Sequence, residues 1–372
     1  MAGLNETPSG DRTHIAFFGL RNAGKSTLVN ALTGQEIAIV SDVAGTTTDP
    51  VSKAMEILPL GPCLITDTAG LDDEGPLGEE RVRRSLEVLE KTDVAVWVAA
   101  EDDAGSEEER RFDAACRARS VPVLKYRRGD SVEGLKAKIA GVKLAEAPRP
   151  LVADLVAPGD VVACVCPIDE SAPKGRLILP QQQVVRELLD AGCSALVCQP
   201  AQLEAVLARS GGVRFVVTDS QAFGEVARVV PPDMPLTSFS IVFARAKGDL
   251  AAYCEGAEAM KRLKDGDLVL ISEGCTHHRQ CIDIGTVKLP KWLQAHAGCS
   301  LRFEFSSGSS FPDDLSRFAL VVQCGGCMLT RRAVQARIAR CREAGVPIVN
   351  YGIAIAACHG IHASPNTCMV IR

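Results

Sequence analysis

The sequence lacks any apolar stretch long enough to span a bilayer, and its first residues, MAGLNETPSGDR, lack the apolar core of a signal peptide. It also lacks an excess of positive charge. The net charge of −5 argues against nonspecific binding to nucleic acid or to acidic membrane surfaces. No low-complexity tract and no short-period repeat interrupts the chain. We therefore expect a cytoplasmic protein that binds neither membranes nor nucleic acid.

What the chain does have is the composition of an ordinary globular protein. Its 372 residues are 47% apolar and 23% charged, enough for two or three domains with sizeable cores. The 15 cysteines are numerous, but most stand singly in apolar segments, as Cys63, Cys193 and Cys198 do. In a reducing compartment such residues are buried side chains and not disulfides. Only the closely spaced cysteines need another explanation.

Strand-like and helix-like segments alternate along the whole chain, which predicts an α/β fold with parallel sheets. We expect three successive α/β domains at residues 1–150, 151–265 and 266–372. The proline-rich run EAPRPLVADLVAPGD is the predicted linker after the first of them. Within that first domain, Ser106 is the predicted N-cap of the charged helix that begins SEEERRF.

A phosphate-binding loop is the strongest motif. GLRNAGKS, from Gly19 to Ser26, fits G-x-x-x-x-G-K-S/T, and it lies between the predicted strand HIAFFG and the predicted helix STLVNALTG. In such a loop the glycines let backbone N–H groups approach phosphate oxygens, while the lysine reaches the outer phosphates. The nucleotide-binding residues expected from this motif are Asn22, Ala23, Gly24, Lys25, Ser26 and Thr27.

Two further segments complete the expected nucleotide site. In LITDTAG, Asp67 ends a strand where it can hold magnesium through water, and the Gly70 amide can reach a γ-phosphate. The run VAGTTTD offers three threonines, of which we favour Thr47. The predicted magnesium ligands are therefore Ser26, Thr47 and Asp67.

These motifs together resemble the translation-factor-related GTPases, specifically the potassium-dependent, TrmE/Era-like branch that has an asparagine in the phosphate loop. The resemblance implies GTP and Mg²⁺ as ligands, and K⁺ bound with the help of Asn22 in place of an arginine finger. Leu71, which follows DTAG where other GTPases have glutamine, also resembles that branch.

One motif of those GTPases is missing. The run VPVLKYRRGDSVEGLKAKI contains no N-K-x-D, whose aspartate reads guanine, and it leads almost directly into the last helix of the domain. A shortened sheet is therefore expected. Asp130 is a candidate base reader, although an exposed turn aspartate is the simpler interpretation. We expect phosphate and magnesium binding to be intact, guanine selectivity to be weak and any GTP hydrolysis to be slow, and we assign no catalytic residue.

A second candidate site consists of cysteines at predicted strand ends. Cys275 follows one apolar strand in ISEGCTHHRQC, and Cys324 and Cys327 follow another in ALVVQCGGC. Because loops at the carboxyl ends of parallel strands converge, the three thiols are expected to meet. They suit a 4Fe-4S cluster or, with His277, a Cys3His zinc site. A redox pair of Cys324 and Cys327 is a third interpretation.

The segments EGCTHHR, CGGCM, VTDSQAF and VPIVNYGIAI resemble the FeFe-hydrogenase maturation GTPase (HydF) family. The resemblance covers nearly the whole chain. It implies a 4Fe-4S cluster on Cys275, Cys324 and Cys327 with an exchangeable fourth position, for which His277 and Glu273 are candidates. Gln323 stands where the family has a histidine.

The function that the resemblance implies is a scaffold for hydrogenase maturation. Such a protein carries a two-iron subcluster to apo FeFe-hydrogenase, works with two radical-SAM maturases and forms a homodimer. The three expected domains would then be a GTP-binding, a dimerisation and an iron–sulfur cluster-binding domain. The alternative is a regulatory or ribosome-assembly GTPase with structural zinc, and a thiol oxidoreductase is the third possibility.

Overall fold

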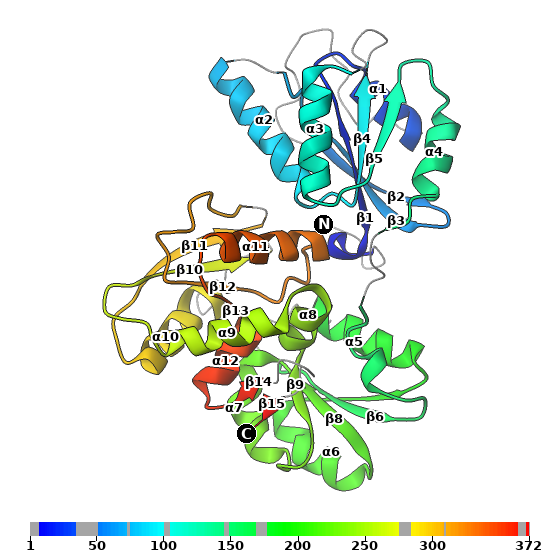
Figure 1. Ribbon diagram of the computed structural model, residues 1–372. Helices are drawn as coiled ribbons and strands as arrows, with labels where there is room; N and C mark the ends of the chain where they lie inside the picture. The colour runs from blue at the N-terminus through cyan, green and yellow to red at the C-terminus, as the bar shows by residue number, and fades with distance from the viewer. Residues whose placement is uncertain are drawn as a thin grey trace. The chain divides into compact units, whose positions relative to one another are not determined.

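The structure is a computed structural model that describes residues 7–34, 51–72, 75–99, 105–144, 149–168, 177–274, 284–308, 310–363 and 370–371. It divides into two compact units, Met1–Ala147 and Pro148–Arg372, and each is described by itself. Both units consist of sheets and helices that alternate along the chain (Figure 1). The predicted α/β fold is confirmed. No helix among the described residues is long and apolar enough to cross a membrane.

The first unit contains one five-stranded sheet with helices on both faces. The strands lie in the order β2-β3-β1-β4-β5, and only β2 runs antiparallel to its neighbour. Its elements are η1 (Ser9–Asp11), β1 (Thr13–Phe18), α1 (Lys25–Thr33), β2 (Val51–Ile57), β3 (Gly61–Asp67), α2 (Gly75–Leu89), β4 (Val94–Ala99), α3 (Glu107–Ala118), β5 (Val123–Arg127) and α4 (Val132–Ala140).

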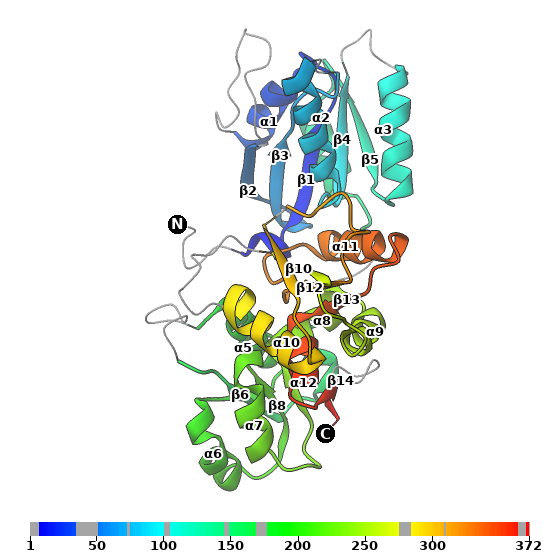
Figure 2. The ribbon, with the colours of Figure 1, turned by 90° about the vertical axis from the view of Figure 1, so that its left-hand side faces the viewer.

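Two apolar clusters, one on each face of this sheet, form the core of the first unit. Helices α1 and α4 pack on one face through residues such as Leu28 and Ile139, and α2 and α3 pack on the other through Leu89 and Phe112. Figure 1 labels all four helices, and in Figure 2 α2 lies in front of the sheet. The helix α4 follows β5 after a short turn, so the sheet is short in the way that the sequence predicted. The predicted cap of α3 is also confirmed, because Ser106 Oγ accepts a hydrogen bond from the Glu109 N–H at 3.1 Å.

The second unit contains two sheets. The six-stranded sheet has the order β14-β15-β9-β8-β6-β7, and the four-stranded sheet has the order β11-β10-β12-β13. The elements up to the second sheet are η3 (Ala153–Leu155), β6 (Val161–Val165), α5 (Leu179–Asp190), β7 (Ser194–Cys198), η4 (Pro200–Gln202), α6 (Leu203–Arg209), β8 (Val213–Thr218), η5 (Ser220–Ala222), α7 (Phe223–Val229), β9 (Leu236–Ser238), α8 (Phe239–Lys247) and α9 (Leu250–Met260). The remaining elements are β10 (Leu268–Glu273), the π-helix η6 (Ile284–Lys288), α10 (Leu289–Ala297), β11 (Arg302–Ser307), β12 (Leu320–Gln323), α11 (Arg331–Glu343), β13 (Ile348–Asn350), α12 (Tyr351–Cys358), β14 (His362–Ala363) and β15 (Val370–Ile371).

One continuous apolar core joins the two sheets of the second unit. Helix α9 packs on β13, and α12 contacts both α8 and α10. The chain also returns at its end, since β15 pairs antiparallel with β9 in the six-stranded sheet. The two sheets therefore pack around one common core. The domain boundary that the sequence predicts between residues 151–265 and 266–372 stays a prediction.

Candidate nucleotide and cysteine sites

The phosphate loop connects β1 to α1 in a conformation that its sequence dictates. Gly19 cannot carry a side chain, because a Cβ there would lie 2.2 Å from the Val98 carbonyl oxygen of β4. Asn22 and Gly24 both have positive φ values, 61° and 91°. Glycine tolerates that conformation and asparagine does so better than most residues. Ala23 is buried, whereas Asn22 and Thr27 are exposed.

Lys25 and Ser26 begin α1 directly after this loop. The Lys25 ammonium is buried, and it donates to the carbonyl oxygens of Gly19 at 3.1 Å and of Leu20 at 2.7 Å. The Ser26 hydroxyl donates to Asp67 Oδ2 at 2.6 Å. The structure therefore places side by side two of the residues that the sequence predicted as magnesium ligands.

Asp67, at the end of β3, is 1% exposed. Burial raises the pKa of its carboxyl group, and the hydrogen bond from Ser26 counteracts that shift. Among the described residues, Asp67 Oδ1 has no hydrogen-bond partner. A hydroxyl beside a carboxylate with a spare oxygen fits magnesium, which prefers oxygen ligands. Thr47, the third predicted magnesium ligand, lies outside the described residues.

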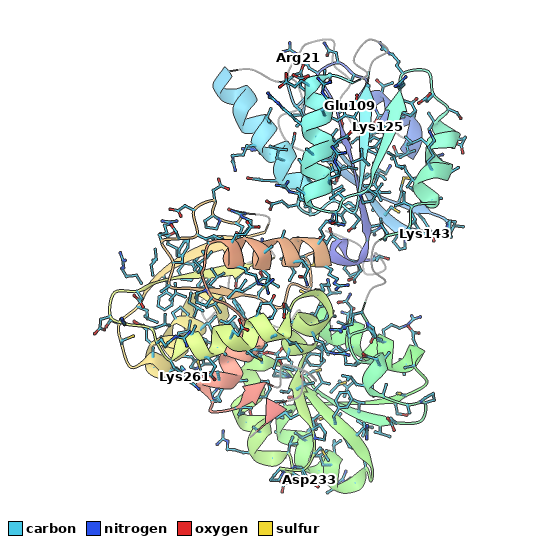
Figure 3. All side chains as sticks on the ribbon, in the orientation of Figure 1. Arg21, Glu109, Lys125, Lys143, Asp233 and Lys261 are labelled. Carbon is cyan, nitrogen blue, oxygen red and sulfur yellow. The ribbon has the colours of Figure 1, made fainter. Side chains whose placement is uncertain are left out.

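The DTAG segment lies against the phosphate loop, as its role requires. A Cβ on Gly70 would lie 2.9 Å from the backbone nitrogen of Arg21, so this residue must be small. The Leu71 N–H donates to the Gly19 carbonyl at 3.3 Å. Asp72 accepts from the Arg21 N–H at 2.6 Å, at the edge of the unit where Figure 3 labels Arg21.

Strand β5 and the turn after it, which contains the candidate base-reading residue Asp130, make hydrogen bonds and ion pairs within the first unit. The Asp130 carboxylate accepts from the Arg127 N–H at 2.9 Å, and the Asp130 carbonyl accepts from the Tyr126 hydroxyl, also at 2.9 Å. Lys125 forms ion pairs with Glu109 and Asp113 of α3, and Figure 3 labels Lys125 and Glu109. Asp130 therefore has the contacts of a turn residue, which agrees with the simpler interpretation of the sequence.

The cysteine site lies where β10 and β12 end as neighbours in the four-stranded sheet. Cys324 follows β12, and its sulfur accepts a hydrogen bond from the Gly274 N–H at 3.0 Å. Cys275 and His277 lie outside the described residues, but Cys275 is bonded directly to Gly274. Cys327 belongs to the same short loop as Cys324. Among the described residues no group of three or more metal-ligating side chains is found.

The surroundings of Cys324 combine burial with backbone donors. Burial raises the pKa of its thiol, whereas hydrogen bonds from the Gly274 and Gly326 N–H groups lower it. Such N–H donors stabilise a negatively charged sulfur, as in cluster-ligating thiolates. Sulfur ligands in a partly enclosed loop fit an iron–sulfur cluster, and they also fit zinc.

Glu273, one of the two candidates for the fourth position, and Gln323, which stands where the family has a histidine, both have partners in the protein. Tyr351 donates its hydroxyl to Glu273 Oε1 at 3.4 Å. Gln323 is 1% exposed, and its amide nitrogen lies 3.4 Å from the hydroxyl of Tyr253 on α9. The Gln323 side chain is therefore part of the core. The loop of residues 324–329, which carries Cys324 and Cys327, is called the cysteine loop below. The sequence analysis did not single out Lys247 or Asn350, which contact this loop, because neither belongs to a recognisable motif.

Three models of known protein families match successive parts of the chain. A family model for the hydrogen maturase F dimerization domain matches residues 151–248, and one for the hydrogen maturase F tetramerization domain matches residues 251–364. A model for the 50S ribosome-binding GTPase domain matches residues 14–125. The two maturase matches together cover more than half of the chain and support oligomerisation.

Two curated relatives each match about a quarter of the chain. The tRNA modification GTPase MnmE of Methylobacterium sp. (strain 4-46) is 42% identical over 104 residues, which cover 26% of this chain and 24% of that protein. GTPase Der of Wolinella succinogenes is 45% identical over 98 residues, covering 26% and 20%. The chain thus spans about a quarter or less of these relatives' length.

Among solved structures, Era from Aquifex aeolicus matches 82% of this chain and 94% of its own at 17% identity and a TM-score of 0.28, which is too low to establish a common fold over the matched length. A GTPase domain of the TrmE/Era-like branch precedes two maturase domains, and such a GTPase domain implies GTP and Mg²⁺ as ligands. The chain belongs to the hydrogen maturase F family.

Proposed function

We propose that this protein binds a 4Fe-4S cluster on Cys275, Cys324 and Cys327 and serves as a scaffold that delivers a two-iron subcluster to apo FeFe-hydrogenase. The observation that carries the proposal is the hydrogen bond from Gly274 to the Cys324 sulfur, because Gly274 directly precedes Cys275. Three thiolates leave one coordination position open for exchange. A carrier needs such a position in order to release its cargo.

The proposal extends to the partners and to the nucleotide. Two radical-SAM maturases would supply the subcluster, and the protein would act as a homodimer or a larger oligomer in the cytoplasm. The fourth ligand would be His277 or Glu273, since the Gln323 side chain is taken up by the core. In the first unit, Lys25, Ser26 and Asp67 would hold MgGTP, with Thr47 as a further magnesium ligand, and Asn22 would help to bind K⁺.

Metal and sulfide analysis of anaerobically purified and reconstituted protein tests the cluster. We expect about four iron and four sulfide per chain, as a 4Fe-4S cluster requires, and loss of most of both in Cys275→Ser and Cys327→Ser. Cys254→Ser is the matched control, because Cys254 lies on α9 outside the cysteine loop. One tightly held zinc per chain would instead favour a structural zinc site, and equal iron in all variants would contradict the assignment.

The missing N-K-x-D predicts weak guanine selectivity. We expect the dissociation constants of GTP and ATP, each with Mg²⁺, to differ by less than about tenfold, the factor that corresponds to 1.4 kcal/mol. Titration of GTP, ATP and XTP on one preparation measures this, with Lys25→Ala as the variant that should weaken all three alike. A strong preference for GTP would mean that another residue reads the base.

A further inference from the structure

Helix α8 supports the loop that carries Cys324 and Cys327. Lys247, the last residue of α8, is 8% exposed. Its ammonium group lies 3.4, 3.3 and 2.9 Å from the main-chain carbonyl oxygens of Gly326, Cys327 and Leu329. An ammonium group has three N–H donors, and here three carbonyls of one loop accept from them.

The first turn of the same helix contacts the other end of the loop. A Cβ on Gly325 would lie 3.2 Å from Ser240 Oγ, so the loop passes close over α8. Ser240 donates to the Asn350 side chain at 3.0 Å, and Asn350 in turn donates to the Cys324 carbonyl at 3.4 Å. The cysteine loop is therefore held at both of its ends by polar groups that are not its own.

The position of Lys247 is itself secured. The amide nitrogen of Gln335, on α11, donates to the carbonyl oxygens of Lys247 and Gly248, both at 3.0 Å. Removing an ammonium from water is costly, and a neutral side chain would fill the same space at lower cost. A buried charge 3.3 Å from the Cys327 carbonyl oxygen therefore suggests a role beyond packing.

We propose that Lys247 is a positioning residue for the cysteine loop and that it has two roles there. Its three hydrogen bonds hold residues 324–329 in the conformation that presents both thiols. Its positive charge, in surroundings of low dielectric constant, stabilises additional negative charge on a bound cluster and so favours the reduced state. The effect on the reduced state rests on the proposed function, whereas the ordering of the cysteine loop concerns the apo-protein.

Three variants of the full-length protein separate these effects. Lys247→Met removes the charge and the donors at similar length, whereas Lys247→Arg keeps the charge with a different geometry. Lys261→Met is the matched control, since Lys261 is the exposed C-cap residue of the neighbouring helix α9 and pairs there with Glu258 (Figure 3). Far-UV circular dichroism first checks that each variant folds, and Lys247→Gln replaces Lys247→Met if that variant does not.

Hydrogen exchange of the apo-protein measures the positioning effect. We expect amides in residues 324–330 to exchange at least about tenfold faster in Lys247→Met, because the hydrogen bonds that order the loop are gone. Exchange elsewhere in the second unit should stay as in the wild type, and Lys261→Met should match the wild type throughout.

A redox titration of the reconstituted protein measures the charge effect. At a fixed ambient potential, the ratio of reduced to oxidised cluster should fall at least about tenfold in Lys247→Met, which is a shift of about 59 mV for a one-electron couple. In Lys247→Arg the ratio should stay within about threefold of the wild type, because the charge remains.

The outcomes are distinguishable. If Lys247→Met equals Lys261→Met in both loop exchange and potential, the inference about Lys247 is wrong. Faster exchange with an unchanged potential would retain the positioning role and overturn the electrostatic one. If the wild type binds no iron at all, the proposed function fails, and the exchange measurement still decides whether Lys247 orders the loop.

Discussion

At the scale of single residues, the buried carboxylate of Asp67 in the nucleotide site lowers the stability of the ligand-free protein. Asp67 is buried next to Ser26, and one of its carboxylate oxygens has no hydrogen-bond partner among the described residues. Keeping an incompletely paired carboxylate charged in such a place costs free energy of folding. That cost is the usual price of a preformed ligand site, and it makes Asp67 the residue where stability and binding should respond in opposite directions.

We predict that Asp67→Asn stabilises the metal-free protein by about 0.5–2 kcal/mol at pH 7. Because burial raises the folded-state pKa of Asp67, the folded state takes up a proton more readily than the unfolded state. The wild type therefore gains stability as the pH falls through the folded-state pKa, until the unfolded-state pKa near 3.9 is passed. The advantage of Asp67→Asn should accordingly shrink as the pH falls through the folded-state pKa of Asp67.

Urea denaturation in EDTA at several pH values measures this effect. Fluorescence of Trp97, which is buried in β4, reports on the first unit if Trp292 of α10 is replaced by phenylalanine. The same variant should bind MgGTP at least about tenfold more weakly, since a magnesium-binding carboxylate is lost. Asp113→Asn, which removes a half-exposed ion pair with Lys125, should change neither binding nor the pH profile. An Asp67→Asn variant less stable than wild type at pH 7 in EDTA would contradict the argument.

At the scale of elements, the close approach of α9 to β13 depends on one glycine. A Cβ on Gly256 would lie 2.0 Å from the Ile348 carbonyl oxygen and 3.0 Å from the Val349 nitrogen. A glycine in a helix interior costs about 1 kcal/mol relative to alanine. Its presence in α9 is explained by packing, because any side chain would force the helix away from the sheet whose strand β12 carries the cysteine loop.

We predict that Gly256→Ala lowers the free energy of unfolding of the second unit by about 3 kcal/mol, because the contact is with backbone and cannot relax locally. Gly134→Ala in α4 is the matched control. There the nearest atom lies 3.5 Å away, so helix propensity should dominate and the variant should gain about 0.5–1 kcal/mol. Urea denaturation of both variants decides the matter, and a Gly256→Ala protein of wild-type stability would refute the packing argument.

At the scale of the whole molecule, the two sites belong to different units. The phosphate loop lies within residues 1–147, and the cysteine loop within residues 148–372. The matches to known families divide in the same way, with a GTPase domain in the first unit and two maturase domains in the second. Helix α8, inside the dimerization match, contacts the cysteine loop inside the tetramerization match. The two maturase domains therefore contribute jointly to the cysteine site.

The amino-acid sequence by itself determined the features whose parts are contiguous in the chain. The phosphate loop from Gly19 to Ser26, the Ser106 cap and the alternation of strands with helices depend on backbone geometry and hydrogen bonds within a few residues. The shortened first sheet was also predictable, because N-K-x-D and the segment after it are absent from a continuous run.

Only the tertiary structure decided what depends on residues far apart. Gly274 and Cys324 are 50 positions apart, and Lys247 lies about 80 positions before the carbonyls that accept its hydrogen bonds. The return of β15 to β9 and the commitment of Gln323 to the core are likewise set by packing. Such contacts have no local signal, because they arise from burying apolar faces against one another, and the polar groups enclosed on the way must then find partners wherever the fold places them.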